Sequence, residues 1–223
     1  MKHWLAIFIC ALIAADFVHG DEWKCPHSNV VVHSTDSDDA DAACKAARKA
    51  LEFLATQGLD TTGSVDVRLV TKLPMPCPRS SFGCYDQPNH RIHMLVISEC
   101  LKMRTWVELP LNRSLCESFL THEVAHVVAA ANFTAPKPST LAQEYLANVT
   151  MVSTMSPRQR ERLLEQLPGR GFDSADQMST TYYQLDPARF SAEVYRHFIK
   201  LGNGKVFLQN VLSGRVLNNE GNP

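Results

Sequence analysis

The chain has 223 residues, of which 45% are hydrophobic and 20% are charged. This length suits one domain that buries a sizeable core without help from metals or disulfides. The formal net charge is −1, and neither sign is strongly clustered, which argues against a nucleic-acid or anionic-membrane partner bound by bulk electrostatics.

Residues 1–20 have the order of a signal peptide. A basic start, Met1-Lys2-His3, is followed by an apolar run that ends in Val18-His19-Gly20, just before Asp21. The apolar run is short for a membrane anchor, and no later stretch approaches the roughly 18 apolar residues that a spanning helix needs. An uncleaved anchor is the alternative. We expect a mature domain over residues 21–223 that is secreted or periplasmic, with no stable membrane insertion after cleavage.

The first part of this domain, residues 21–113, is expected to hold one helix and a small mixed or antiparallel sheet. Apolar residues recur at helical spacing from Ala40 to Gln57, and Gly58 ends that helix. The acidic run at 36–41 is interpreted as an N-terminal cap of the helix, in preference to a calcium site. Strands are predicted at 29–33, 64–71, around 82–85 and at 91–97.

The second part, residues 114–223, is predicted to be helical. Apolar periodicity, caps and prolines indicate helices at 114–131, 141–155, 157–167, 187–201 and 205–212. Strands followed by helices alone define an α+β domain.

The sequence His122-Glu123-Val124-Ala125-His126 contains the motif H-E-x-x-H within a predicted helix. Positions i and i+4 lie on one helix face, about 6 Å apart along the axis, so both imidazoles can reach one tetrahedral ion. Glu123 then lies beside the metal, where it can take a proton from a zinc-bound water. The apolar run at 127–131 predicts that this helix is buried, which disfavours two histidines on an ordinary surface helix.

A catalytic zinc needs a third protein ligand and an open position for water. Glu144 lies on the next predicted helix, after a connection that contains Pro136 and Pro138. An antiparallel arrangement of the two helices can bring its carboxylate over the histidines, whereas the next histidine along the chain is His197. We therefore expect Zn²⁺ to be held by His122, His126 and Glu144.

This pattern resembles the gluzincins, zinc metallopeptidases of the peptidase-MA-like clan whose third ligand is a downstream glutamate. The resemblance covers roughly residues 91–213 and does not assign a subfamily. It implies a zincin-like fold, with an N-terminal helix and small sheet followed by a helical half, and it places strand 91–97 near the cleft as an edge for an extended peptide.

Two positions depart from the gluzincin pattern. Asn148 stands where related enzymes place an aspartate that holds a zinc histidine, and its side-chain carbonyl can still accept an imidazole N–H. Phe190 stands where a tyrosine often stabilises the oxyanion. Four other residues are candidates for that role, and we favour the first two: Tyr182, Tyr183, Tyr195 and His197.

Of 7 cysteines, Cys10 lies in the expected signal peptide, so an even number remains for disulfides in an oxidising compartment. Their connectivity is left open, and pairing of nearest neighbours along the chain would close only short loops.

The sequence thus predicts an exported zinc peptidase that acts on a peptide or protein substrate by metal-activated water, with Glu123 as general base. Two alternatives are a catalytically inactive zincin-like binding module and a disulfide-stabilised binding domain with an accidental motif. Substrate specificity and the choice between endopeptidase and exopeptidase action are left open.

Overall fold

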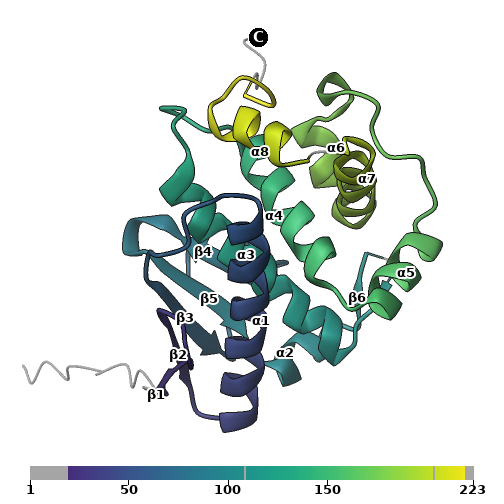
Figure 1. The fold of residues 1–223 in the computed structure, drawn as a ribbon. Helices are drawn as coiled ribbons and strands as arrows, with labels where there is room; N and C mark the ends of the chain where they lie inside the picture. Colours follow the sequence, from purple (N-terminus) through teal and green to yellow (C-terminus); the bar gives the residue numbers. More distant parts are fainter. Residues whose placement is uncertain (1–19, 108, 203, 219–223) are drawn as a thin grey trace, which may run out of the picture.

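The computed structural model describes residues 20–107, 109–202 and 204–218 (Figure 1). The expected signal peptide, including Cys10, lies outside the described residues except for Gly20. The fold is α+β, as expected. The strands of the larger sheet gather on one side of the molecule, and the helices that follow α3 (Arg113–Asn132) extend to the other side (Figure 1).

A five-stranded mixed sheet forms the first part of the domain, in the order β1-β2-β3-β5-β4. Its three inner strands, β2, β3 and β5, are parallel, and the two edge strands are antiparallel to their neighbours. Alternate residues of the inner strands point into the core because side chains of a strand alternate between faces. The strands are β1 (Asp21–Lys24), β2 (Val30–Ser34), β3 (Val65–Val70), β4 (Gly83–Asp86) and β5 (Arg91–Leu95).

The expectation that strand 91–97 forms the edge near the cleft is wrong. β5 lies between β3 and β4, and it ends at Leu95 before a short helix begins at Ile97. The chain reverses through a 3₁₀ turn, η1 (Gln87–Asn89), and His90 then adopts a left-handed conformation with φ of 49°. This tight turn folds β4 back along β5, so β4 is the edge strand instead.

The long helices lie where the sequence predicted them. Several short elements were not predicted, because they have too few residues to show a periodic pattern of apolar side chains. These missed elements include β1, α2, α6 and a small hairpin of β6 and β7. The helices are α1 (Ser37–Thr56), α2 (Ile97–Lys102), α3 (Arg113–Asn132), α4 (Thr140–Thr154), α5 (Pro157–Gln166), α6 (Thr180–Leu185), α7 (Pro187–Lys200) and α8 (Gly204–Leu212). The remaining elements are β6 (Thr105–Trp106), β7 (Leu109–Pro110) and a second 3₁₀ turn, η2 (Ala175–Gln177).

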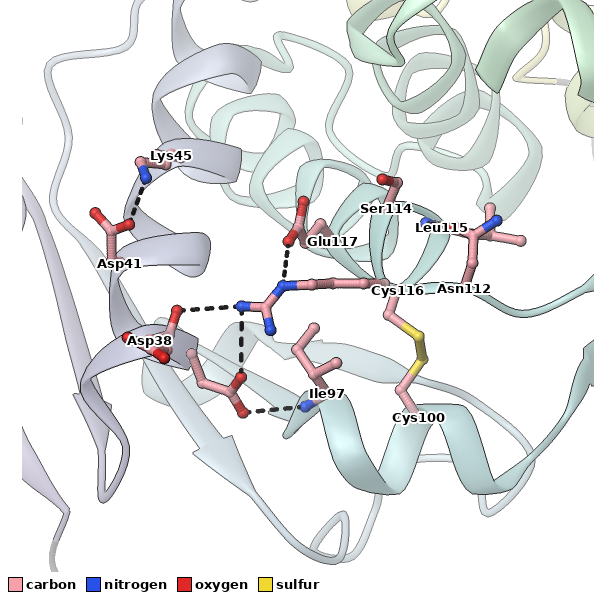
Figure 2. A network of polar contacts seen from close by, with 12 residues as sticks. Asp38, Asp41, Lys45, Ile97, Cys100, Asn112, Ser114, Leu115, Cys116 and Glu117 are labelled. Atoms are coloured by element: carbon pink, nitrogen blue, oxygen red, sulfur yellow. Dashed lines mark hydrogen bonds and ion pairs between the residues drawn. A yellow bond between two sulfur atoms is a disulfide. The ribbon is translucent and has the colours of Figure 1, made fainter. Parts of the chain in front are cut away.

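The acidic run before α1 serves as a cap and as an anchor. The Asp36 side chain accepts from the backbone N–H groups of the first turn of α1, which confirms the capping interpretation. Asp39 accepts from the backbone N–H of Ile97 at 3.2 Å, which ties α1 to the start of α2. Arg113, in the first turn of α3, pairs with Glu117 at 3.0 Å and extends towards α1 (Figure 2). The N-terminal end of α3 is therefore fixed against α1 and α2.

Three disulfides join each cysteine of the domain to its nearest neighbour along the chain. One of them, drawn in Figure 2, links α2 to α3. The bonds are Cys25–Cys44, Cys77–Cys84 and Cys100–Cys116. Disulfides form and persist in oxidising compartments, so these bonds fit an exported protein. Within the described residues, no helix combines the length and the apolar character that crossing a bilayer requires.

Candidate metal centre

The H-E-x-x-H motif lies in the middle of α3, which is buried between α1, α4 and the edge of the sheet. His122 and His126 face the same direction one turn apart, and their Nε2 atoms lie 3.1 Å from each other. Only 14% of the His122 side chain and 12% of the His126 side chain is exposed. These are therefore not two histidines on an ordinary surface helix.

Glu144 reaches both histidines from α4. Ser139 caps α4 directly after the proline-containing connection by accepting from the backbone N–H of Ala142, and α4 then packs along α3. The Glu144 carboxylate lies 3.3 Å from Nε2 of His122 and 3.5 Å from Nε2 of His126. Each residue offers one ligand atom, and these atoms all lie within 4.8 Å of one another. We call His122, His126 and Glu144 the His-His-Glu group.

The spacing and chemistry of the His-His-Glu group fit a zinc ion. Ligand atoms about 2.0–2.2 Å from a tetrahedral ion lie about 3.3–3.6 Å apart. The two imidazole nitrogens lie 3.1 Å apart, and they approach different oxygens of Glu144, Oε2 at 3.3 Å and Oε1 at 3.5 Å, so each of these contacts lies near that range. Two imidazole nitrogens and one carboxylate oxygen are also a donor set that catalytic zinc sites use.

The protonation states of two of these side chains suit ligation. Burial by itself would raise the pKa of Glu144, but the neighbouring His122 and His126, with hydrogen bonds from His122 and Tyr183, hold this pKa at about 2. Burial lowers the pKa of His126 to about 4, although Glu144 opposes the shift. An ionised carboxylate and a neutral imidazole are the forms that bind metals.

Glu123 is buried beside the group without belonging to it. Burial raises its pKa to about 7, against the charge of His122 and a hydrogen bond from the backbone N–H of Tyr85. A carboxyl group that titrates near neutral pH can both accept and return a proton. This is the property that a general base needs.

The edge strand β4 holds Glu123 from the side opposite α4. Tyr85 of β4 supplies the backbone N–H that Glu123 accepts. At Gly83, two residues earlier, an added Cβ would lie 3.2 Å from Cγ of Glu123 and 2.6 Å from Sδ of Met94. The missing side chain therefore lets the strand approach α3 closely, and the Cys77–Cys84 disulfide anchors the residue between Gly83 and Tyr85.

Of the four residues considered for oxyanion stabilisation, Tyr183 lies at the group. Its hydroxyl makes a hydrogen bond with Glu144, and burial raises its pKa, so the phenol stays protonated. Tyr182 instead packs its ring against Phe172 and Phe190. Successive residues of a helix point about 100° apart, so only one of the two adjacent tyrosines of α6 can face Glu144.

The other two candidates belong to packing and polar contacts elsewhere. His197 is buried on α7, and its Nδ1 lies 2.8 Å from the Tyr145 hydroxyl. The guanidinium of Arg160 lies over the ring of Tyr195, with its Cζ atom 5.6 Å from the ring centroid.

Asn148 contacts Glu144, and not a histidine as expected. Its Nδ2 donates to the backbone carbonyl of Glu144 at 2.8 Å and lies 3.4 Å from the Glu144 carboxylate. Its side-chain oxygen accepts from the Ser191 hydroxyl of α7. The i to i+4 spacing on α4 explains this preference, because it places Asn148 one turn from Glu144 on the same face. The contacts of Ser191, Gly83 and Tyr85 with the site were not predicted from the sequence, because these residues belong to no recognisable motif.

A cleft of about 510 Å³ opens beside these residues. Its walls come from the loop before β4, the β6 region, α3, α4 and α6. The lining residues include His122, Glu123, Asn148 and Tyr183, while Tyr182 does not line it. Glu123 and His122 are therefore accessible to a ligand in the cleft.

Fold and site together define a disulfide-bonded α+β protein with a candidate metal centre beside a cleft. The chain belongs to DUF6639, a family of unknown function, whose model matches residues 30–220. No curated protein and no solved structure matches the chain.

Proposed function

We propose that this protein is a zinc-dependent peptidase, exported to the cell exterior or the periplasm, that hydrolyses bonds of a peptide or protein substrate. The observation that supports it best is the convergence of the His-His-Glu group, in which one ligand atom from each residue lies within 4.8 Å of the others, next to a buried glutamate whose pKa is about 7. The three disulfides support the exported location.

A bound zinc ion would supply Lewis acidity, which activates water at neutral pH and polarises a carbonyl. Glu123 accepts the proton of the attacking water and passes it to the leaving amine, so the carboxylate is regenerated at the end of each turnover. Its pKa of about 7 leaves a sizeable ionised fraction at neutral pH. The Tyr183 hydroxyl, protonated over the same range, is the donor that we assign to the oxyanion of the tetrahedral intermediate. Asn148 holds the Glu144 carboxylate in place.

The test combines zinc content with cleavage of a peptide library by the mature protein and by Glu123→Gln. We expect about one zinc per chain in both proteins and a loss of cleavage of roughly 10²- to 10⁴-fold in the variant, because the substitution removes proton transfer and spares the ligands. Glu117→Gln is the matched control, since Glu117 lies on the same helix but pairs with Arg113 at the helix start.

The two alternatives predict other results. Bound zinc without cleavage that depends on Glu123 would indicate a binding module that retains the metal site. A purified protein that takes up no zinc would mean that the motif is accidental.

A further inference from the structure

Aromatic and thioether side chains form part of the cleft lining. The rings of Phe82 and Phe119 stack with centroids 4.1 Å apart, and Trp106 meets Phe119 edge to face at 5.2 Å. Met103 and Met151 complete this wall. We call these five residues the apolar wall. Because they come from the loop before β4, from α3, from α4 and from the segment between α2 and β7, the wall exists only in the folded chain.

The apolar wall lies next to the His-His-Glu group, at a spacing that a neighbouring residue of a bound substrate can span. Phe119 precedes His122 by nearly one turn of α3, which places the two Cα atoms about 4.5 Å apart along the helix axis. Consecutive Cα atoms of an extended chain are about 3.8 Å apart. A substrate whose carbonyl points at the His-His-Glu group therefore directs an adjacent side chain at the apolar wall.

The cleft offers little charge for recognition. Among the described residues that line it, the acidic and basic side chains are those of His122 and Glu123, which the proposed chemistry already uses. The remaining lining residues are apolar or neutral, among them Ser80, Ser81 and Gln184. A charged side chain, or a free amino or carboxyl terminus, would lose its hydration there without gaining an ionic partner, which is unfavourable.

We propose that the cleft binds an interior segment of a polypeptide and holds a bulky apolar side chain, aromatic or leucine-like, next to the bond that is cleaved. Cleavage of the bond rests on the proposed function, whereas the binding preference follows from the apolar wall alone. It makes the protein an endopeptidase that selects exposed hydrophobic segments, in place of an enzyme that trims chain ends.

The test separates binding from chemistry. Octapeptides with an acetylated N-terminus and an amidated C-terminus, identical except for Phe, Leu, Asp or Lys at one central position, are titrated into zinc-loaded Glu123→Gln by calorimetry. The same peptides are given to the wild-type protein, and products are identified by mass spectrometry. We expect the Phe and Leu peptides to bind roughly 10- to 100-fold more tightly than the Asp and Lys peptides, because the apolar wall buries their side chains. We also expect cleavage beside the central residue.

Two matched substitutions locate the preference. Met103, 36% exposed, belongs to the apolar wall, whereas Leu101, 40% exposed, lies nearby on α2 outside the cleft. Met103→Glu is expected to weaken binding of the Phe peptide at least tenfold and to improve binding of the Lys peptide, because it places a carboxylate in the wall. Leu101→Glu is expected to leave both affinities unchanged.

The outcomes distinguish this proposal from the proposed function. Equal cleavage of all four peptides, or cleavage of their uncapped forms alone, would overturn the inference and leave the peptidase standing. Selective binding that Met103→Glu abolishes, without any cleavage, would support the inference and count against the peptidase. Equal affinities for the four peptides would refute the apolar preference whatever the activity.

Discussion

Replacing Asn148 by alanine tests how the protein holds Glu144, the proposed third metal ligand. The substitution removes the hydrogen bond from Asn148 Nδ2 to the Glu144 carboxylate, at 3.4 Å, and leaves the one from Tyr183. Loss of a contact to a metal ligand typically lowers metal affinity by about 10- to 100-fold. Because the bond is long, its donor is neutral and the second donor remains, we expect the lower end of this range, about tenfold or about 1.4 kcal/mol.

The assay is a zinc titration against a competing chelator of known affinity at pH 7.5. Thr150→Ala is the matched control, because Thr150 is buried on the same helix and donates to a backbone carbonyl four residues earlier, at 2.9 Å, without touching the His-His-Glu group. We expect this control to bind zinc like the wild type even if both variants lose stability. Combining Asn148→Ala with Tyr183→Phe should bring the total loss to roughly 100-fold. Wild-type zinc affinity in Asn148→Ala, within a factor of about two, would refute the assignment of Asn148 as a support of Glu144.

Three further predictions follow from the packing and the pKa shifts. Gly83→Val is expected to destabilise the fold by about 1–3 kcal/mol and to reduce peptide cleavage, because the added carbons collide with Met94 and push on Glu123. Both effects are measured by urea unfolding and cleavage assays. The control is Gly63→Ala, because an added Cβ at Gly63 meets nothing within 4 Å. The pKa of His197 lies below its ordinary value because of burial and the charge of Lys200. Below about pH 6.5 the imidazole is therefore protonated more readily in the unfolded chain than in the folded chain. In urea unfolding with a chelator present, we expect the free energy of unfolding to fall as the pH is lowered from about 7 to 5, and to fall less steeply in His197→Gln. An identical pH dependence in both proteins would contradict this. Chelating zinc from a sample that held the free ion roughly 100-fold above its dissociation constant should lower the free energy of unfolding by about 2.7 kcal/mol in thermal scans, and no shift of the melting temperature would argue against a site in the folded state.

The elements that the sequence predicted correctly depend on interactions between residues close along the chain. The long helices are indicated by apolar periodicity, by capping residues such as Asp36 and Ser139, and by prolines. The H-E-x-x-H pair is local in the same sense, since helical geometry alone puts His122 and His126 on one face. Short elements such as α6 escaped because six residues do not display a period.

Other features depend on contacts between distant parts of the chain. The choice of Tyr183 over its neighbour Tyr182 depends on the rotation of α6 relative to α4, which neighbouring residues do not encode. The edge position of β4 depends on a turn that folds the strand back on β5. The contact between Asn148 and Ser191 depends on the packing of α7 against α4, whereas the contact with Glu144 comes from the spacing within α4.

The sequence by itself determined that two histidines and a glutamate lie close together at helical spacing, since they come from one local motif. Only the tertiary structure decided which groups from elsewhere join them: the Glu144 carboxylate from α4, the Tyr183 hydroxyl from α6, the Tyr85 backbone from β4 and the apolar wall of the cleft. The reason is physical. Helix periodicity is set by hydrogen bonds within a few residues, whereas convergence of separate elements is set by how their buried faces fit together across the whole core.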